Sequence, residues 1–163
     1  MAGKMERKYL AHFLDASFGA TTKNYVRLGK DLEEYNEELN PDVEIQKNIL
    51  GEQNVQHSGY EVQSEVEPYY AYDGDALFTK LCEIANTRAT GDAIMTTKVD
   101  VLFDSTGTVV WAYREDVAVI PNSVGGDTSG WAIPVNIYPI GAVTKKNIVY
   151  DMTTNEATIT DIT

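Results

Sequence analysis

Side chains that could act as nucleophiles, bases or metal ligands are few in this sequence and lie far apart. The two histidines, His12 and His57, have no histidine, cysteine or carboxylate pair at the spacing of a metal site. Ser129 lies in a glycine-rich turn, but a nucleophilic serine of that kind needs a partner histidine, and none follows it in the chain. Asp73-Gly74-Asp75 offers too few oxygen ligands for an EF-hand loop. We therefore expect no catalytic site, no metal and no cofactor.

Carboxylates recur instead at every second position of two segments, the spacing of one face of a β-strand. In residues 60–67 one face carries Glu61, Gln63, Glu65 and Glu67, and the other carries Tyr60, Val62, Ser64 and Val66. In residues 42–46 one face carries Asp42, Glu44 and Gln46, opposite Val43 and Ile45. Like charges in a row destabilise a sheet through repulsion. Two explanations stay open: an ordinary solvated face, or a surface that repels a polyanion lying close to it.

The overall charge narrows the possible partners. The chain has 163 residues, with 13 Lys and Arg against 25 Asp and Glu and a net charge of -12. This balance argues against a nucleic-acid binder and against an anionic membrane surface, since both need clustered basic residues. The single Cys82 excludes an internal disulfide and a multi-cysteine metal site. The length favours one domain, and no apolar run is long enough for a transmembrane helix.

The N-terminal segment combines basic and apolar residues. Lys4, Arg7 and Lys8 precede an apolar run that His12 and Asp15 interrupt, and the run is too short and polar for a signal peptide. We expect an intracellularly made, soluble chain. Residues 1–23 are predicted to form an arm ahead of the core, and an exposed apolar arm of this kind marks an interface. Its predicted contacts with a neighbouring subunit are Tyr9, Leu10, Phe13 and Leu14.

The first half of the chain predicts strands separated by polar segments. Strand patterns cover residues 25–30, 42–49 and 60–72. Residues 31–41 are acidic and end in Asn40-Pro41, a turn signal. Residues 51–59 are polar and bracketed by glycines, which predicts a protruding loop.

One helix is predicted, followed by β-structure. Asp73-Gly74-Asp75 supplies N-cap candidates, Gly91 is a stop signal, and one buried face is formed by Leu77, Phe78, Leu81, Cys82, Ile84 and Ala85. Strands are predicted at 95–103, 108–120, 131–140, 146–152 and 157–162, with an edge position or bulge at Pro134 and Pro139. The expected fold is a single, mainly β domain over residues 1–163, an antiparallel sandwich or barrel with one packed helix.

The order of these parts resembles the small major tail tube proteins of long-tailed bacteriophages and of phage-tail-like particles from Gram-positive bacteria. The resemblance spans nearly the whole chain as an order of elements and short phrases. Those phrases are Tyr25 to Leu32, the acidic stretch to Asn40-Pro41, Asn48 to Glu52, Gly59 to Val62, Pro68-Tyr69-Tyr70, the helix, and the later hairpins.

The resemblance implies a β-sandwich-like subunit that forms hexameric rings stacked into a tube. The tape-measure protein and then DNA pass through the tube, and tail terminator and tip proteins are further partners. The lumen of such tubes is acidic, so DNA passes without specific binding; no membrane partner is implied. The strand alternation and the resemblance together place the acidic face in the lumen, which predicts lumen positions for Asp42, Glu44, Glu61, Glu65 and Glu67. Gln53, Asn54 and His57, in the predicted loop, are expected at subunit contacts. The expected location is the virion tail, after assembly in the host cytoplasm.

Other functions stay open at this point. The inner tube of a contractile bacteriocin or injection machine shares the architecture. A secreted ligand-binding β-sandwich would fit the fold, but it predicts a signal peptide and an aromatic-lined cleft. An enzyme would need a catalytic pair.

Overall fold

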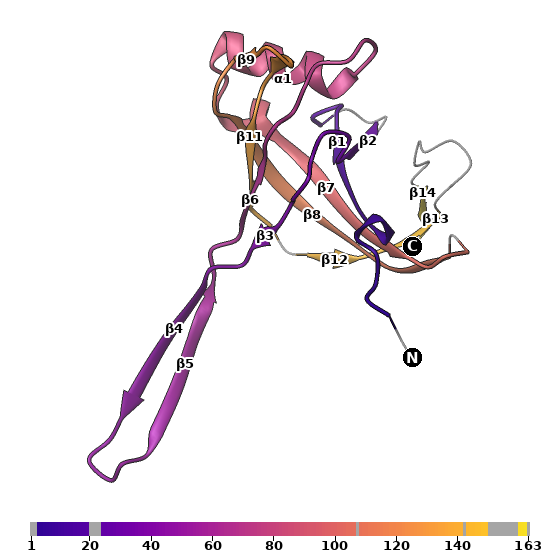
Figure 1. Cartoon of the computed structure of the whole chain (residues 1–163). Helices are drawn as coiled ribbons and strands as arrows, with labels where there is room; N and C mark the ends of the chain where they lie inside the picture. The colour runs from indigo at the N-terminus through magenta and orange to yellow at the C-terminus, as the bar shows by residue number, and fades with distance from the viewer. Residues whose placement is uncertain (1–2, 20–23, 107, 142, 150–159, 163) are drawn as a thin grey trace.

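The computed structural model describes residues 3–19, 24–106, 108–141, 143–149 and 160–162. Its main feature is a curled, eight-stranded antiparallel sheet in the order β2-β1-β7-β8-β11-β6-β3, with β12 beside β8 (Figure 1). These strands are β1 (Leu10–Asp15), β2 (Tyr25–Leu28), β3 (Glu37–Glu38), β6 (Gln63–Val66), β7 (Met95–Phe103), β8 (Val109–Pro121), β11 (Val135–Pro139) and β12 (Thr144–Lys145). The mainly β fold with one α-helix predicted from the sequence is thus confirmed for the described residues.

Three two-stranded ribbons accompany the sheet. They are β4 (Pro41–Lys47) with β5 (Gln53–Tyr60), β9 (Gly125–Asp127) with β10 (Gly130–Ala132), and β13 (Asn147–Val149) with β14 (Thr160–Ile162). Short 3-10 turns occur at Arg7–Tyr9 and Gly91–Ile94. The predicted closing hairpin is present as β13 and β14, while residues 150–159, which include its predicted turn, lie outside the described part of the chain.

The helix α1 (Ala76–Thr87) packs on one face of the sheet, where it covers the larger core. It begins as predicted, because the Asp75 carboxylate accepts hydrogen bonds from the backbone N–H groups of Leu77 and Phe78. Arg88 ends it in the left-handed conformation, ahead of the expected stop at Gly91. This core joins Leu77, Phe78 and Leu81 of the helix to residues of the sheet and its connections, among them Val66, Val117, Val119, Ile133, Val135 and Ile137. Ile84 of the helix is also buried. No helix in the described residues is long and apolar enough to cross a membrane.

The prediction that residues 1–23 form an arm is corrected by the structure. Residues 10–15 are strand β1 within the sheet. β1 pairs with β2 on one side and β7 on the other. Phe13 and Leu14 are fully buried on opposite faces, one in each hydrophobic core. Leu10 is half-buried, and the half-buried Tyr9 packs edge-on against Phe103. A strand buried on both faces has a continuous apolar run without alternation, so its sequence can be mistaken for an exposed apolar arm.

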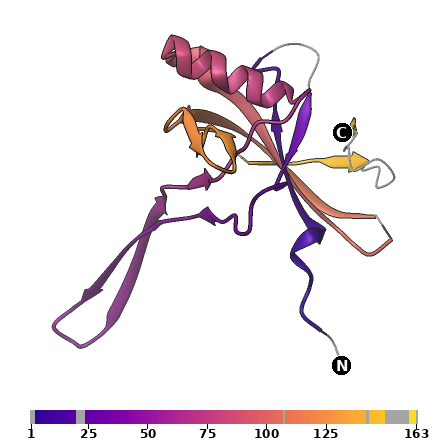
Figure 2. The same cartoon turned by 45° about the horizontal axis from the view of Figure 1, so that its top comes forward.

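A second correction concerns residues 51–59, predicted as a loop. Residues 53–60 are strand β5, which pairs with β4 in a long hairpin that stands away from the body (Figures 1 and 2). The turn at its tip is built by Asn48, whose side-chain oxygen accepts from the backbone N–H groups of Leu50 and Glu52. Gly51 takes a positive φ of 80°, which only glycine adopts readily.

Candidate assembly surfaces

The β4–β5 hairpin presents an apolar face to solvent. Directly opposed residues share a face of an antiparallel pair, and the register opposes Val43 to His57, Ile45 to Val55 and Lys47 to Gln53. The relative exposure of Val43 is 48%, of Ile45 60% and of Val55 58%. At the tip, Ile49 and Leu50 are also exposed. The alternation in residues 42–46 suggests that Val43 and Ile45 enter the core of their own subunit, but they do not, because their strand leaves the body.

The opposite face of the hairpin is polar. There Glu44 opposes Gln56 and Gln46 opposes Asn54, while Asp42 precedes a break in the register. The three residues predicted at subunit contacts divide between the faces: Gln53 and His57 lie on the apolar one and Asn54 on the polar one. All three are exposed, and the His57 ring lies edge-on to Tyr60, with 4.6 Å between ring centroids.

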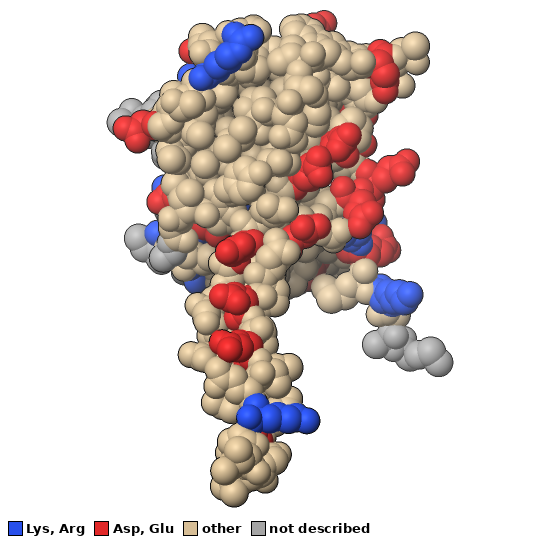
Figure 3. Space-filling model, turned by 90° about the vertical axis from the view of Figure 1, so that its left-hand side faces the viewer, with Lys and Arg blue, Asp and Glu red and all other residues tan. Residues whose placement is uncertain are grey.

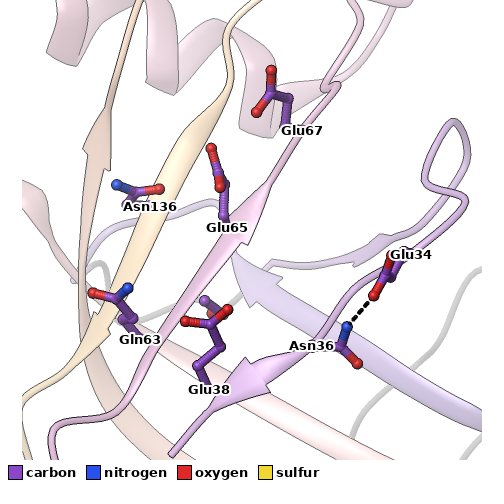
Figure 4. A pocket seen from close by; sticks show the side chains of 8 residues that line it. Glu34, Asn36, Glu38, Gln63, Glu65, Glu67 and Asn136 are labelled. Atoms are coloured by element: carbon purple, nitrogen blue, oxygen red, sulfur yellow. Dashed lines mark hydrogen bonds between the residues drawn. The ribbon is translucent and has the colours of Figure 1, made fainter. Parts of the chain in front are cut away.

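A second acidic surface lies on the body, over β3 and β6. As predicted from the alternation, Gln63 and Glu65 on β6 are exposed while Ser64 and Val66 are buried. Glu65 lies with Glu38, Glu67 and Asn136 around a hollow of about 350 Å³ (Figure 4), which Glu34, Asn36, Gln63 and Ser64 also line. A hydrogen bond with Glu67, then burial, then the charges of Glu67 and Glu38 raise the pKa of Glu65. These carboxylates therefore share one negative field.

The five residues predicted to face a lumen are all exposed, but they do not form one tight cluster. Glu65 and Glu67 line the hollow on the body, Asp42 and Glu44 lie out on the hairpin, and Glu61 lies between them at the hairpin base. Figure 3 shows acidic side chains along the hairpin and continuing over the adjoining body. The hairpin carries a single basic residue, Lys47, at the end of β4.

The body contains a buried ion cluster that the sequence predictions do not include. The Lys98 side chain is 0% exposed, and its Nζ lies 2.8 Å from a Glu115 oxygen, 3.0 Å from Glu37 and 3.2 Å from Asp100. These carboxylates are close enough together to hold a metal ion, but the Lys98 ammonium already lies among them as their cation. Lys98 and Asp100 occupy the same face of β7, and Lys98 directly opposes Glu115 on β8.

His12 extends this cluster. Its Nδ1 contacts Asp100, and its Nε2 lies 2.7 Å from the Arg7 guanidinium. Because Arg7 can only donate, Nε2 is the acceptor, and Nδ1 carries the proton that His12 donates to Asp100. His12 is thus held on both ring nitrogens, by Asp100 and by Arg7.

The other chemical candidates also have structural partners. Ser129 donates its backbone N–H to the Asp127 carboxylate in the turn between β9 and β10. Asp75 caps α1 and accepts a hydrogen bond from the Tyr69 hydroxyl at 2.6 Å. These contacts agree with the turn and cap interpretations of the two motifs.

Comparison with known proteins identifies the fold. No family model and no curated protein matches the sequence. One similar solved structure is the PVC sheath/tube terminator of an extracellular contractile injection system, in its extended state. It superposes with a TM-score of 0.57 at 9% identity, over 90% of this chain and 99% of that one. Another is the tube-terminating cap of the anti-feeding prophage, with a TM-score of 0.55, 11% identity and 90% and 93% coverage. The chain therefore has the fold of proteins that terminate the tubes of phage-tail-like particles.

Proposed function

We propose that this protein is a structural subunit, a single tail-tube-like domain, of the tube of a phage-tail-like particle. In this proposal the subunits form hexameric rings that stack coaxially, and the subunit has no enzymatic activity. The shared fold with two tube-terminating proteins supports a role in a tube. The observation that carries the proposal is the β4–β5 hairpin, whose apolar face lies outside its own subunit.

The exposed apolar face of the hairpin is explained by contact with another copy. Burying an aliphatic side chain of this size contributes about 1.5–3 kcal/mol, and those of Val43, Ile45 and Val55 are only half covered in the subunit. The body also exposes apolar side chains that such a hairpin could cover, among them Ile120, Val124, Trp131, Ile140 and Val143. In the ring or stack, Gln53 and His57 then lie at the subunit contact, beside the apolar residues.

The polar face of the hairpin is then left for the lumen. If the apolar face docks on a neighbour, Asp42 and Glu44 remain exposed on the other side. We propose that they line the channel together with Glu61, Glu65 and Glu67. Carboxylates there offer DNA no exchange of counterions for protein cations, so DNA and the tape-measure protein before it pass without binding.

A second candidate is a tube terminator, which closes the end of a tube as one ring. The two structural comparisons favour this role, since both proteins are terminators or caps. In each comparison the match with this chain spans nearly the whole length of the other protein. A tube subunit needs two complementary ring surfaces and polymerises without limit, whereas a terminator needs only one and stops.

Negative-stain microscopy of the purified protein tests the proposal. Long tubes support a tube subunit, isolated rings support a terminator, and monomers at high concentration contradict both. The triple variant Val43→Ser, Ile45→Ser, Val55→Ser should stay folded but fail to assemble. The matched control, Gln46→Ser with Gln56→Ser on the opposite face, should assemble as the wild type does.

A further inference from the structure

The hairpin is joined to the body through a short base. Its two legs continue into β3 and β6, and only two residue pairs join these strands, Glu37 to Ser64 and Glu38 to Gln63. Past this base, all residues of β4 and β5 except Gly59 are exposed, so the body gives the ribbon little support. A two-stranded ribbon with such a base does not hold a fixed direction by strand pairing alone.

Two hydrogen bonds clamp the legs where the hairpin leaves the body. The Asn40 side chain donates to the Glu61 carbonyl at 3.0 Å, and the Glu61 backbone N–H donates to the Asn40 carbonyl at 3.2 Å. This clamp holds the legs to each other, and the second leg continues into β6, which pairs with β11 in the sheet. The first leg has no such partner strand beyond β6, so its hold on the body depends on the contacts of residues 35–38.

Tyr35 is the first of these contacts. It is buried, its ring lies 4.5 Å from that of His12, and its hydroxyl donates to Ser64 Oγ at 2.9 Å. Arg7 donates to its carbonyl at 3.2 Å. Since Ser64 belongs to β6, Tyr35 links the first leg to the second and to the body.

Glu37 is the second contact and the one nearer the hairpin. Its carboxylate reaches through the base to Lys98, which lies fully buried on β7, a central strand of the sheet. Lys98 is itself held by Asp100 and Glu115. An ion pair with a buried partner is screened much less by salt than one between exposed side chains.

We propose that Glu37 is a positioning residue, which fixes the direction of the β4–β5 hairpin through its ion pair with Lys98. The anchor orders the hairpin before it meets a neighbouring subunit and so lowers the entropy cost of docking. This second step rests on the proposed function, whereas the first concerns the isolated subunit.

Removing the Glu37 charge should loosen the hairpin without unfolding the body. Lys98 keeps Asp100 and Glu115 as partners, and the negative charge of Glu37 itself helps to raise the pKa of Glu115. Glu38, its neighbour on β3, lines the exposed hollow and supplies a control with the same change of charge on the same strand.

The test measures the spread of distances between spin labels on the hairpin and on α1, in monomeric full-length protein. Labels at Asn54→Cys and Asn86→Cys in a Cys82→Ala background lie on exposed positions. Glu37→Gln should broaden the distance distribution by roughly twofold or more, and Glu38→Gln should leave it unchanged. An equally narrow distribution in Glu37→Gln overturns the anchor. If Glu37→Gln does not fold, Glu37→Asp, which shortens the side chain by one methylene, decides on the same criterion.

Assembly gives a separate second measurement. The critical concentration for ring or tube formation should rise roughly three- to tenfold in Glu37→Gln and stay unchanged in Glu38→Gln. A broadened hairpin with an unchanged critical concentration would overturn the pre-ordering step. Failure of every variant and of the wild type to assemble would contradict the proposed function and leave the spin-label result to decide the anchor.

Discussion

At the scale of single residues, the buried charges around Lys98 are the most consequential feature. Burial acts to lower the pKa of Lys98, but the negative charges around it, led by Asp100, raise it well above the usual range, so Lys98 stays protonated. The pKa of Glu115 is raised, because the effect of burial exceeds the opposing effect of the hydrogen bond and charge of Lys98. The two directions agree physically, because one ammonium shared by three carboxylates cannot fully compensate each of them.

Asp100 provides a test of this cluster by pH. Burial alone would raise its pKa, but the hydrogen bond from His12 and the charge of Lys98 hold it below the usual 3.8. An acid with a lowered folded-state pKa adds stability that is complete above its unfolded value and is lost as pH falls through the folded one. Asp100→Asn should therefore cost about 2–3 kcal/mol at pH 7, and this difference from wild type should shrink below about pH 4.

Urea unfolding from pH 2.5 to 8 measures this difference. Asp116→Asn, at an exposed position of β8, is the control for the loss of one charge and should shift stability by less than about 0.5 kcal/mol. If the free energy of unfolding of Asp100→Asn stays below that of wild type by the same amount down to pH 2.5, the charge of the carboxylate does not contribute to stability.

At the scale of elements, α1 depends on one side chain with two tasks. The carboxylate of Asp75 caps the helix and accepts from Tyr69, whose pKa is raised by burial first and then by this hydrogen bond. Asp75→Ala should lower the free energy of unfolding by about 2 kcal/mol, since it removes a cap and leaves the half-buried Tyr69 hydroxyl unpaired. Asp73→Ala, at an exposed position before the helix, should cost less than about 0.5 kcal/mol in the same denaturation experiment. Equal losses in both variants would contradict the assignment of the cap.

Elements with one buried face could be predicted from the sequence. The spacing of Leu77, Phe78 and Leu81 gave α1, and the alternation about Ser64 and Val66 gave β6 with its acidic face. The sequence does not indicate strand β1, because both of its faces are buried and Phe13 and Leu14 therefore show no alternation. The sequence does not indicate strand β5 either, because a hairpin outside the body needs no core face and its residues are mostly polar.

The ion cluster could be predicted only in part. Lys98 and Asp100 stand two apart in a strand whose other residues are apolar or threonine, a signal that one face of β7 buries charge. Glu37 and Glu115 come from two other strands, and their meeting at Lys98 depends on the sheet order. That order is a tertiary property which the spacing of residues within a strand does not contain.

At the scale of the whole molecule, the proposed tube gives the excess of carboxylates and the projecting hairpin one common explanation. A tube that DNA must pass needs a channel wall that does not bind phosphate, and subunits that hold the wall together by contacts elsewhere. In the proposed tube the hairpin separates these tasks on its two faces, with Val43, Ile45 and Val55 on one and Glu44, Gln46, Asn54 and Gln56 on the other. Under this proposal the net charge of -12 is a functional property of the surface.

Reversing the charge of the proposed channel wall tests this explanation directly. The triple variant Glu61→Lys, Glu65→Lys, Glu67→Lys changes exposed residues, so the fold should survive and microscopy should show the wild-type rings or tubes. Its assemblies should retain single-stranded or duplex DNA at low salt, with affinity that falls steeply as salt rises, and particles that contain it should eject DNA slowly or not at all. The control Asp73→Lys, Glu83→Lys, Asp92→Lys places the same charges at exposed positions in and around α1, none of which is among the proposed channel residues. Unimpaired ejection from the first variant would contradict the assignment of these carboxylates to the lumen. Equal impairment by both variants would contradict it as well, because the added charge would then act independently of its position.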